Sequence, residues 1–162
     1  MGPVEFNALS PEEAQRRLLG CFASSKWARQ VAAGRPYAGI AAVLDAAERA
    51  WADLTPADWD EALRGHPRIG EGGGSSPAAS EREQGSVRVA GAAALAQLAD
   101  ENRRYEACFG HVFLIAAAGK DGEEILAELR ARMGNDPVTE AQVAAAEHRK
   151  IARIRLKDMV GE

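Results

Sequence analysis

This 162-residue sequence has few cysteines, no excess of basic charge and no long apolar run. Its two cysteines, Cys21 and Cys108, lie far apart and have neither Cys-x-x-Cys nor Cys/His spacing. Neither a disulfide framework nor a zinc knuckle is therefore indicated, and we expect two reduced, buried thiols. No apolar stretch approaches the roughly 20 residues that cross a bilayer, and the opening MGPVEFNALSPEEA carries acids where a signal peptide has a basic start. We therefore expect a cytoplasmic protein without a membrane span.

The charge balance and the histidine spacing argue against two further classes of protein. Lys and Arg number 20 against 24 Asp and Glu, and the net charge of −4 disfavours nucleic acid and anionic membranes as partners. The three histidines, His66, His111 and His148, show neither HxH nor HExxH spacing, so we expect no metal site. A glycine-rich stretch at 70–79 lacks the Gly-Lys-Ser/Thr that completes a phosphate-binding loop.

Helix signals recur along the whole chain. Start signals stand at Ser10-Pro11, at Ser24 or Ser25, at Pro36 and at Thr55-Pro56. Apolar spacing predicts further helices at about 80–109, 123–133 and 139–159. The apolar run FLIAA at 113–117 is short enough to be extended, but one such run makes no sheet. We predict an all-α fold, a single-domain bundle of about seven or eight helices over residues 1–162.

A conformationally restricted histidine precedes the glycine-rich stretch. His66 follows the helix-stopping Gly65, and Pro67 disfavours the α conformation for the residue before it. The side chain is thus either a surface histidine in a turn or an acid/base group, because imidazole titrates near neutrality. The stretch EGGGSSPAAS at 70–79 is correspondingly either a flexible connector or a lid beside a site.

A serine and a glutamate at the next helix start also allow two interpretations. Ser80 and Glu83 fit the capping box S-x-x-E, in which each side chain satisfies a backbone N–H of the first turn. The Glu83 carboxylate could also converge with His66 across the loop and form an acid/base pair.

One arginine of the last helical segment falls on the apolar side. At 100° per residue, Arg149, Arg153 and Lys157 form a basic face, whereas Arg155 lies roughly opposite, beside Ile151. Its stem could return the charge to water, or its guanidinium could meet a carboxylate of Glu83 or of a ligand. We expect His66, Glu83 and Arg155 to face a common cavity.

The sequence contains, in this order, the four motifs HPRIG, SEREQ, FGHVFLIAAAGK and EHRKIARIRLKD. Together they resemble the 2-oxo-4-hydroxy-4-carboxy-5-ureidoimidazoline (OHCU) decarboxylase family, and the similarity extends over nearly the whole chain, including FASSKWARQVAAGRPY. The resemblance implies a carboxy-lyase of urate breakdown that yields (S)-allantoin, and an all-helical homodimer that uses no cofactor and binds a small-molecule substrate.

The resemblance also implies roles for individual residues. It places His66 and Glu83 as catalytic residues, and the substrate-binding positions would be Pro67, Ser80, Gln84, Phe113, Leu114, Ile115, Ala116, Ala117 and Arg155. Two positions depart from the family pattern. Arg68 stands where some members carry Asp, and His111-Val112 replace a Phe-Pro pair.

Two other functions remain open from the sequence. A helical interaction module without catalysis would use the alanine-rich helices as a groove for a partner. A related enzyme could instead process another ureide, for example by hydrolysing a neighbouring ring.

Overall fold

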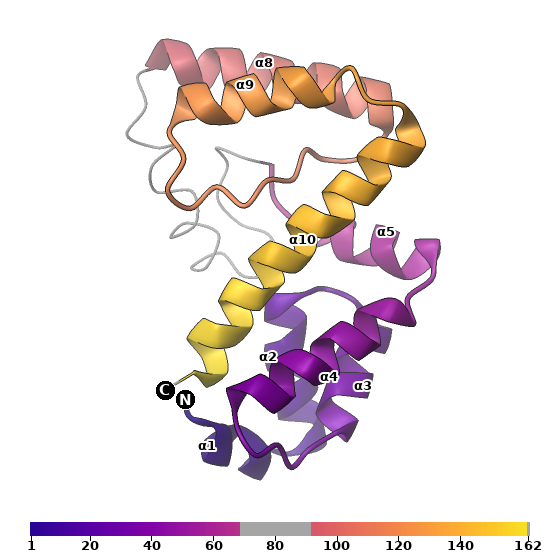
Figure 1. Cartoon of the computed structure of the whole chain (residues 1–162), viewed down its shortest axis with the longest axis vertical. Coiled ribbons are helices and arrows are strands. Elements are labelled where there is room, and N and C mark those ends of the chain that lie inside the picture. The colour runs from indigo at the N-terminus through magenta and orange to yellow at the C-terminus, as the bar shows by residue number, and fades with distance from the viewer. Residues whose placement is uncertain (69–91, 162) are drawn as a thin grey trace. The chain divides into compact units, whose positions relative to one another are not determined.

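The computed structural model describes residues 1–68 and 92–161. Within these residues the chain forms eight α-helices and no β-strand, which confirms the predicted all-α class (Figure 1). The helices are α1 (Pro3–Ala8), α2 (Pro11–Cys21), α3 (Ser25–Ala33), α4 (Ile40–Ala52), α5 (Pro56–Arg64), α8 (Ala92–Phe109), α9 (Gly122–Arg132) and α10 (Pro137–Val160). No helix in the described ranges is long and apolar enough to span a membrane.

The chain divides into two compact units. The first unit consists of Met1–Gly65 and Ile151–Glu162, and the second unit consists of His66–Lys150. Helix α10 therefore contributes residues 137–150 to the second unit and residues 151–160 to the first. That residues 1–162 act as one domain stays a prediction.

Side-chain caps begin several helices where the sequence predicts them. The Ser10 hydroxyl accepts a hydrogen bond from the Glu13 N–H, and the Ser24 hydroxyl accepts one from Trp27. Thr55 and Asp58 form a reciprocal capping box at the start of α5. Such caps satisfy backbone donors that have no partner inside the helix, and each contributes about 1 kcal/mol.

The prediction that Pro36 opens a helix is wrong. Helix α4 begins only at Ile40, because the side-chain amide of Asn7 pairs with both backbone groups of Tyr37. The two bonds, each 2.8 Å long, give the Tyr37 backbone partners other than a helix turn. Asn7 itself lies on α1, a short helix that the sequence analysis missed.

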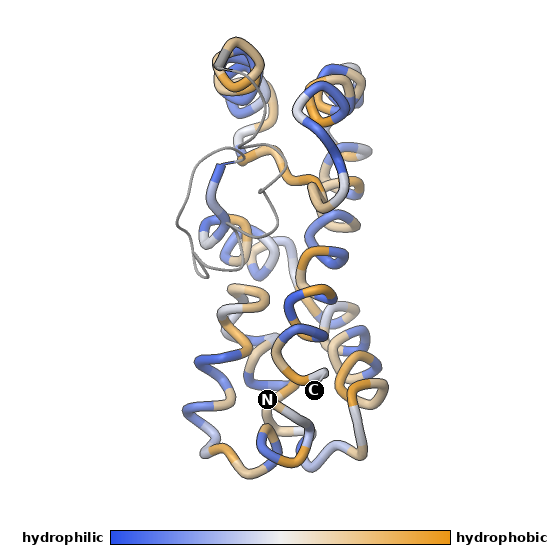
Figure 2. The backbone as a smooth tube through the Cα atoms, turned by 90° about the vertical axis from the view of Figure 1, so that its left-hand side faces the viewer, coloured by the Kyte–Doolittle hydropathy of each residue, from blue (hydrophilic) through white to orange (hydrophobic). Residues whose placement is uncertain are grey.

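Aromatic side chains fill the core of the first unit. The rings of Trp27 and Trp51 stack with their centroids 5.5 Å apart, and Phe22 meets both rings edge to face. The end of α10 adds Ala152, Leu156 and Val160, all fully buried. Each buried large side chain contributes about 1.5–3 kcal/mol. The alternation of hydrophobic and hydrophilic residues that drives this burial is visible along the backbone (Figure 2).

The expectation of two buried thiols holds for only one cysteine. Cys21 is buried in the first unit, with its sulfur 3.8 Å from that of Met159, and both cysteines are free thiols. Cys108 is exposed, so its predicted burial is wrong. Its place near the end of α8 falls on the solvent side of that helix.

In the second unit, α8 packs against α9 over a smaller apolar core. Residues 113–117 lie between these helices in sequence and adopt neither helix nor strand (Figure 1). Gly110 and Gly119, which bound the segment, both have positive φ angles, of 78° and 79°. Glycine adopts this conformation without a steric penalty, so the two residues allow the chain to leave α8 and to turn before α9.

Candidate functional site

His66 lies directly after the end of α5, as the sequence predicts. Helix α5 ends at Arg64, with Gly65 as its C-cap, and the His66 side chain is half-buried. Its Nδ1 lies 3.2 Å from the carbonyl oxygen of Pro67. Because a carbonyl can only accept, this contact favours the tautomer with the proton on Nδ1. Nε2 is then the ring nitrogen without a hydrogen in this tautomer.

The imidazole of His66 packs against a second imidazole. The ring centroids of His66 and His148 are 5.3 Å apart, and the ring planes are nearly perpendicular at 86°. His148 lies on α10 within the second unit and is 2% exposed. In the sequence, His148 was a candidate only as a metal ligand, and its contact with His66 was not predicted.

The 113–117 segment presents its side chains to the core. Phe113, Leu114, Ile115 and Ala117 are buried, and Ala116 is half-buried. The Leu114 carbonyl accepts a hydrogen bond from Arg132, and the Ala117 carbonyl accepts one from the Lys120 N–H. That the backbone of this segment contacts a ligand stays a prediction.

A buried ionic network holds this segment in place. The Arg132 guanidinium donates to Glu140 from Nε at 2.8 Å and from Nη2 at 2.5 Å, and both residues are at most 4% exposed. Tyr105 and Asn135 donate to the same carboxylate, at 2.5 Å and 3.0 Å. Every oxygen of the buried carboxylate is thus hydrogen-bonded, which offsets its desolvation.

The network shifts the pKa values of its members in opposite directions. Burial acts to raise the pKa of the Glu140 carboxyl, but hydrogen bonds from Arg132, Tyr105 and Asn135 outweigh it, and the pKa falls below its usual 4.5. Burial, together with the neighbouring Glu140 carboxylate, raises the pKa of the Tyr105 phenol above its ordinary value of 10. Glu140 is therefore ionised and Tyr105 protonated at neutral pH.

This network was not predicted, although the sequence contains a signal for it. Arg132 and Glu140 flank the link 133–136 between α9 and α10, so a helix-stopping sequence separates two opposite charges. Charges on either side of such a link can meet across the junction of α9 and α10.

Arg155 points into the apolar side of α10, as its helical position predicts. Its side chain is 5% exposed, in the first unit, and its Nη1 donates to the Gly20 carbonyl at 3.3 Å. Gly20 lies in the last turn of α2, where carbonyls have no partner within the helix and a cation is favourable. Since a guanidinium carries five N–H groups, this bond is compatible with a further contact to a carboxylate.

Several predicted site residues are not brought together by the described structure. Ser80, Glu83 and Gln84, together with the 70–79 stretch, lie outside the described residues. Pro67 is half-buried beside His66. His66 and Arg155 belong to different units, so the common cavity stays a prediction.

The two positions that depart from the family pattern have partners within the second unit. Arg68 forms a two-pronged ion pair with Glu106 on α8, with Nε 2.7 Å from Oε1. The His111 ring meets the Tyr105 ring edge to face, with centroids 5.6 Å apart. Both side chains thus contact residues of α8, Arg68 through an ion pair at the surface and His111 through its ring.

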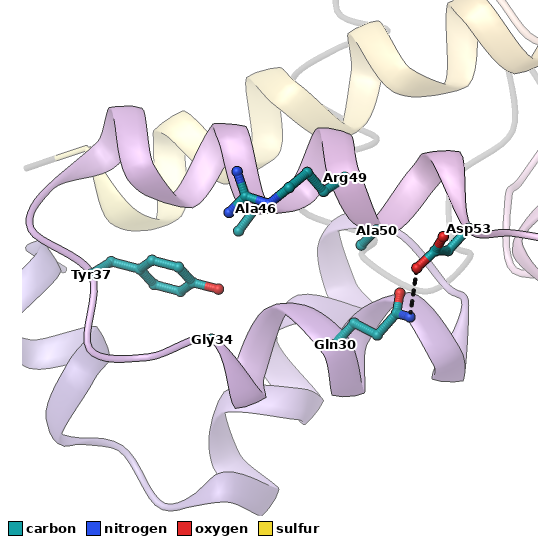
Figure 3. Close-up of a pocket in the computed structure, with 7 residues that line it drawn as sticks. All are labelled: Gln30, Gly34, Tyr37, Ala46, Arg49, Ala50 and Asp53. Atoms are coloured by element: carbon teal, nitrogen blue, oxygen red, sulfur yellow. Dashed lines mark hydrogen bonds between the residues drawn. The ribbon is translucent and has the colours of Figure 1, made fainter.

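A cleft of about 360 Å³ lies in the first unit, between α3 and α4 (Figure 3). Arg49 and Tyr37 lie toward one end, and a hydrogen bond from Gln30 to Asp53 closes the other. None of the residues predicted for the site lines this cleft. Across the described ranges, no group of His, Cys, Asp or Glu side chains has an arrangement that could hold a metal ion.

Comparisons with known proteins agree with one another. Residues 7–157 match the family described as OHCU decarboxylase. The chain is 32% identical over 139 residues to the 2-oxo-4-hydroxy-4-carboxy-5-ureidoimidazoline decarboxylase of Amia calva, which covers 82% of this chain and 79% of that protein. It is 31% identical over 148 residues to the uric acid degradation bifunctional protein TTL of Arabidopsis thaliana, covering 88% of this chain. The chain spans 46% of the Arabidopsis protein, less than half its length.

Solved structures share the fold. A crystal structure of OHCU decarboxylase in the presence of (S)-allantoin matches with a TM-score of 0.79 and 29% identity, covering 91% of this chain and 99% of that one. A crystal structure of (S)-allantoin synthase matches with a TM-score of 0.74 over 99% of this chain and 54% of that one. At 19% identity, the second match concerns the fold alone.

Proposed function

Because this chain belongs to the OHCU decarboxylase family, we propose that it is a carboxy-lyase that converts OHCU to (S)-allantoin in urate degradation. The observation that carries the proposal is the family match over residues 7–157, a range that includes His66 and Arg155. The likeness to a decarboxylase crystallised in the presence of (S)-allantoin supports it. A match of this extent favours a decarboxylase over an interaction module or an enzyme of another ureide.

The chemistry of the substrate explains why amino-acid side chains can catalyse this decarboxylation without a cofactor. CO₂ leaves from ring carbon 4 of OHCU, which also carries the hydroxyl group, and the electron pair of the broken bond passes into the adjacent C5=N bond of the ring. The hydroxyl-bearing carbon and the ureido-bearing carbon are then joined as an enol or enolate. The ring thus serves as its own electron sink. The protein has to orient the ring, stabilise the developing charge and deliver a proton to one face of the enolate. Delivery to one face produces a single enantiomer of allantoin.

Each residue has a role consistent with its position. His66 exchanges protons with the substrate through Nε2, since the contact to Pro67 favours the proton on Nδ1. Arg155, whose buried guanidinium is directed to the apolar side of α10, binds a polar group of the substrate. The backbone of residues 113–117 contacts the ureidoimidazoline ring.

Glu83, Ser80 and Gln84 complete the site. Glu83 acts with His66 as the second proton-transfer group, while Ser80 and Gln84 hold polar groups of the substrate. Their assignment rests on the family resemblance of SEREQ.

An optical assay tests the proposed activity. OHCU is generated in solution from urate, and circular dichroism follows the appearance of optically active allantoin. We expect the protein to accelerate formation of the (S)-enantiomer above the spontaneous rate. Racemic allantoin at the spontaneous rate would contradict the proposal.

The assembly and location of the protein belong to the same proposal. The family resemblance leads us to expect a homodimer, and we propose that it is located in the cytoplasm. Sedimentation equilibrium would report twice the 17.2 kDa mass of the chain if the dimer exists. A mass of one chain across the micromolar range would exclude it.

A further inference from the structure

We infer that His148 is a positioning residue for His66, whose buried ring fixes the plane of the His66 imidazole and hence the direction of Nε2. The inference rests on the proposed function, because that function gives His66 its role in proton transfer. Its geometric basis is the perpendicular contact of the two rings, with centroids 5.3 Å apart.

His148 is itself held rigidly. It is 2% exposed on a continuous helix, which fixes the direction in which its side chain leaves the backbone. Ala144, one turn earlier, is 3% exposed, so this face of α10 is packed against neighbouring side chains. Close-packed surroundings leave a buried ring few rotamers. The ring of His148 therefore has a fixed orientation in contact with the ring of His66.

His66 needs this contact because Pro67 restricts its backbone conformation but not the rotation of its ring. Pro67 limits the backbone of His66, but the last torsion of a histidine is broad and roughly two-fold. Rotation of the ring by 180° would exchange the positions of its nitrogens and carbons. The contact of Nδ1 with the Pro67 carbonyl favours one orientation, and the perpendicular ring of His148 opposes rotation out of that plane. Two contacts together thus define where Nε2 points.

A matched pair of variants distinguishes the effect of a flat ring at position 148 from the effect of side-chain volume alone. His148→Leu keeps most of the buried volume but removes the flat ring, whereas His148→Phe keeps a ring of similar shape. We expect His148→Leu to lower kcat about 10- to 100-fold with KM changed less than about threefold, because misplacement of a proton-transfer group by about 1 Å has effects of this size. We expect His148→Phe to restore kcat to within about fivefold of wild type, since proton transfer by His66 is then intact.

A spectroscopic measurement tests the same inference without substrate. Long-range ¹⁵N–¹H spectra report the tautomer of each imidazole, and His66→Ala identifies the signals of His66. We expect one dominant His66 tautomer in the wild type and in His148→Phe, and an averaged pattern in His148→Leu. Val43→Ala, a fully buried position in the core of the first unit, is the control for general loss of stability and should leave the His66 signals unchanged.

The outcomes distinguish this inference from the proposed function. An altered His66 pattern in His148→Leu alone supports the positioning role, even if the wild-type protein shows no decarboxylase activity. A His66 pattern in His148→Leu identical to wild type overturns the inference, whatever the activity. Equal loss of kcat in the Leu and Phe variants also overturns it, because a nitrogen of His148 and not its ring plane would then matter.

Discussion

Arg132 donates a hydrogen bond of 2.5 Å from Nη1 to the backbone carbonyl of Leu114 while its other nitrogens bind Glu140. The same guanidinium lies over the ring of Phe113, with its central carbon 4.5 Å from the ring centroid. One buried side chain on α9 thus fixes two consecutive residues of the segment that we propose to contact the substrate. The cation–π contact and the charge-assisted hydrogen bond act on a stretch that has no helix or strand to hold it.

Replacing Arg132 by lysine should therefore weaken substrate binding. Lysine keeps the charge next to Glu140, but it cannot bind the carboxylate with two nitrogens and also reach Leu114. We expect Arg132→Lys to raise KM about tenfold and to reduce the free energy of unfolding by about 1–3 kcal/mol. Tyr105→Phe is the control, because it removes a bond to Glu140 and leaves the contact of Arg132 with Leu114 in place. Equal KM values in the two variants would show that the Leu114 contact has no role in binding.

The lowered pKa of Glu140 predicts a loss of stability in acid. Its hydrogen bonds place the folded-state pKa below the usual 4.5, so between these two values the unfolded chain binds more protons than the folded one. The stabilisation is fully present above about pH 4.5 and is lost as the pH falls through the folded-state pKa. Urea unfolding at a series of pH values measures this dependence.

Tyr105→Phe provides a comparison for the acid dependence. Removing the phenol takes away one of the hydrogen bonds that lower the pKa of Glu140. The difference between unfolding free energies at pH 7 and pH 3 should therefore be smaller in this variant than in wild type. An unchanged difference would mean that Tyr105 has no part in keeping Glu140 ionised.

Substitution of Arg155 by lysine should affect substrate binding more than stability. Lysine at this position can still place a positive charge near the last carbonyls of α2, but it cannot bind a carboxylate with two parallel hydrogen bonds. We expect Arg155→Lys to raise KM at least about tenfold while the melting temperature changes by only a few degrees. Steady-state kinetics and calorimetry measure the two effects. A large drop in melting temperature with unchanged KM would assign Arg155 to the capping of α2 alone.

Glu83→Gln separates the two interpretations of the capping box. Glutamine can also serve in a capping box, so stability should change by no more than about 1 kcal/mol. If Glu83 transfers protons, activity should fall about 10²- to 10⁴-fold in the folded variant. Full activity in Glu83→Gln would leave Glu83 with a structural role only.

Local signals in the sequence predicted much of the fold. Ser24 and Gly34 bound α3 as expected, and Thr55 and Gly65 bound α5, because caps and stops act through neighbouring backbone groups. The inward position of Arg155 followed from helical periodicity alone. Predictions of this kind succeed because each depends on residues within a few positions of one another.

The features that the sequence did not reveal depend on contacts between distant residues. Asn7 binds the backbone of Tyr37 and delays the start of α4, although Pro36 carries the local start signal. His148 meets His66 from a helix far along the chain, and no spacing rule links the two. Only the folded arrangement of each unit brings such partners together.

The central claim is that His66 transfers protons during decarboxylation. Its most direct test compares the rate of formation of optically active allantoin by wild-type protein and by His66→Ala. We expect wild type to produce (S)-allantoin and His66→Ala to be slower by about 10²- to 10⁴-fold, since this is the usual contribution of a general acid or base. Its melting temperature should stay close to that of wild type, because His66 lies half-buried in a turn after α5. Equal rates in the two proteins would contradict the account and remove His66 from the mechanism.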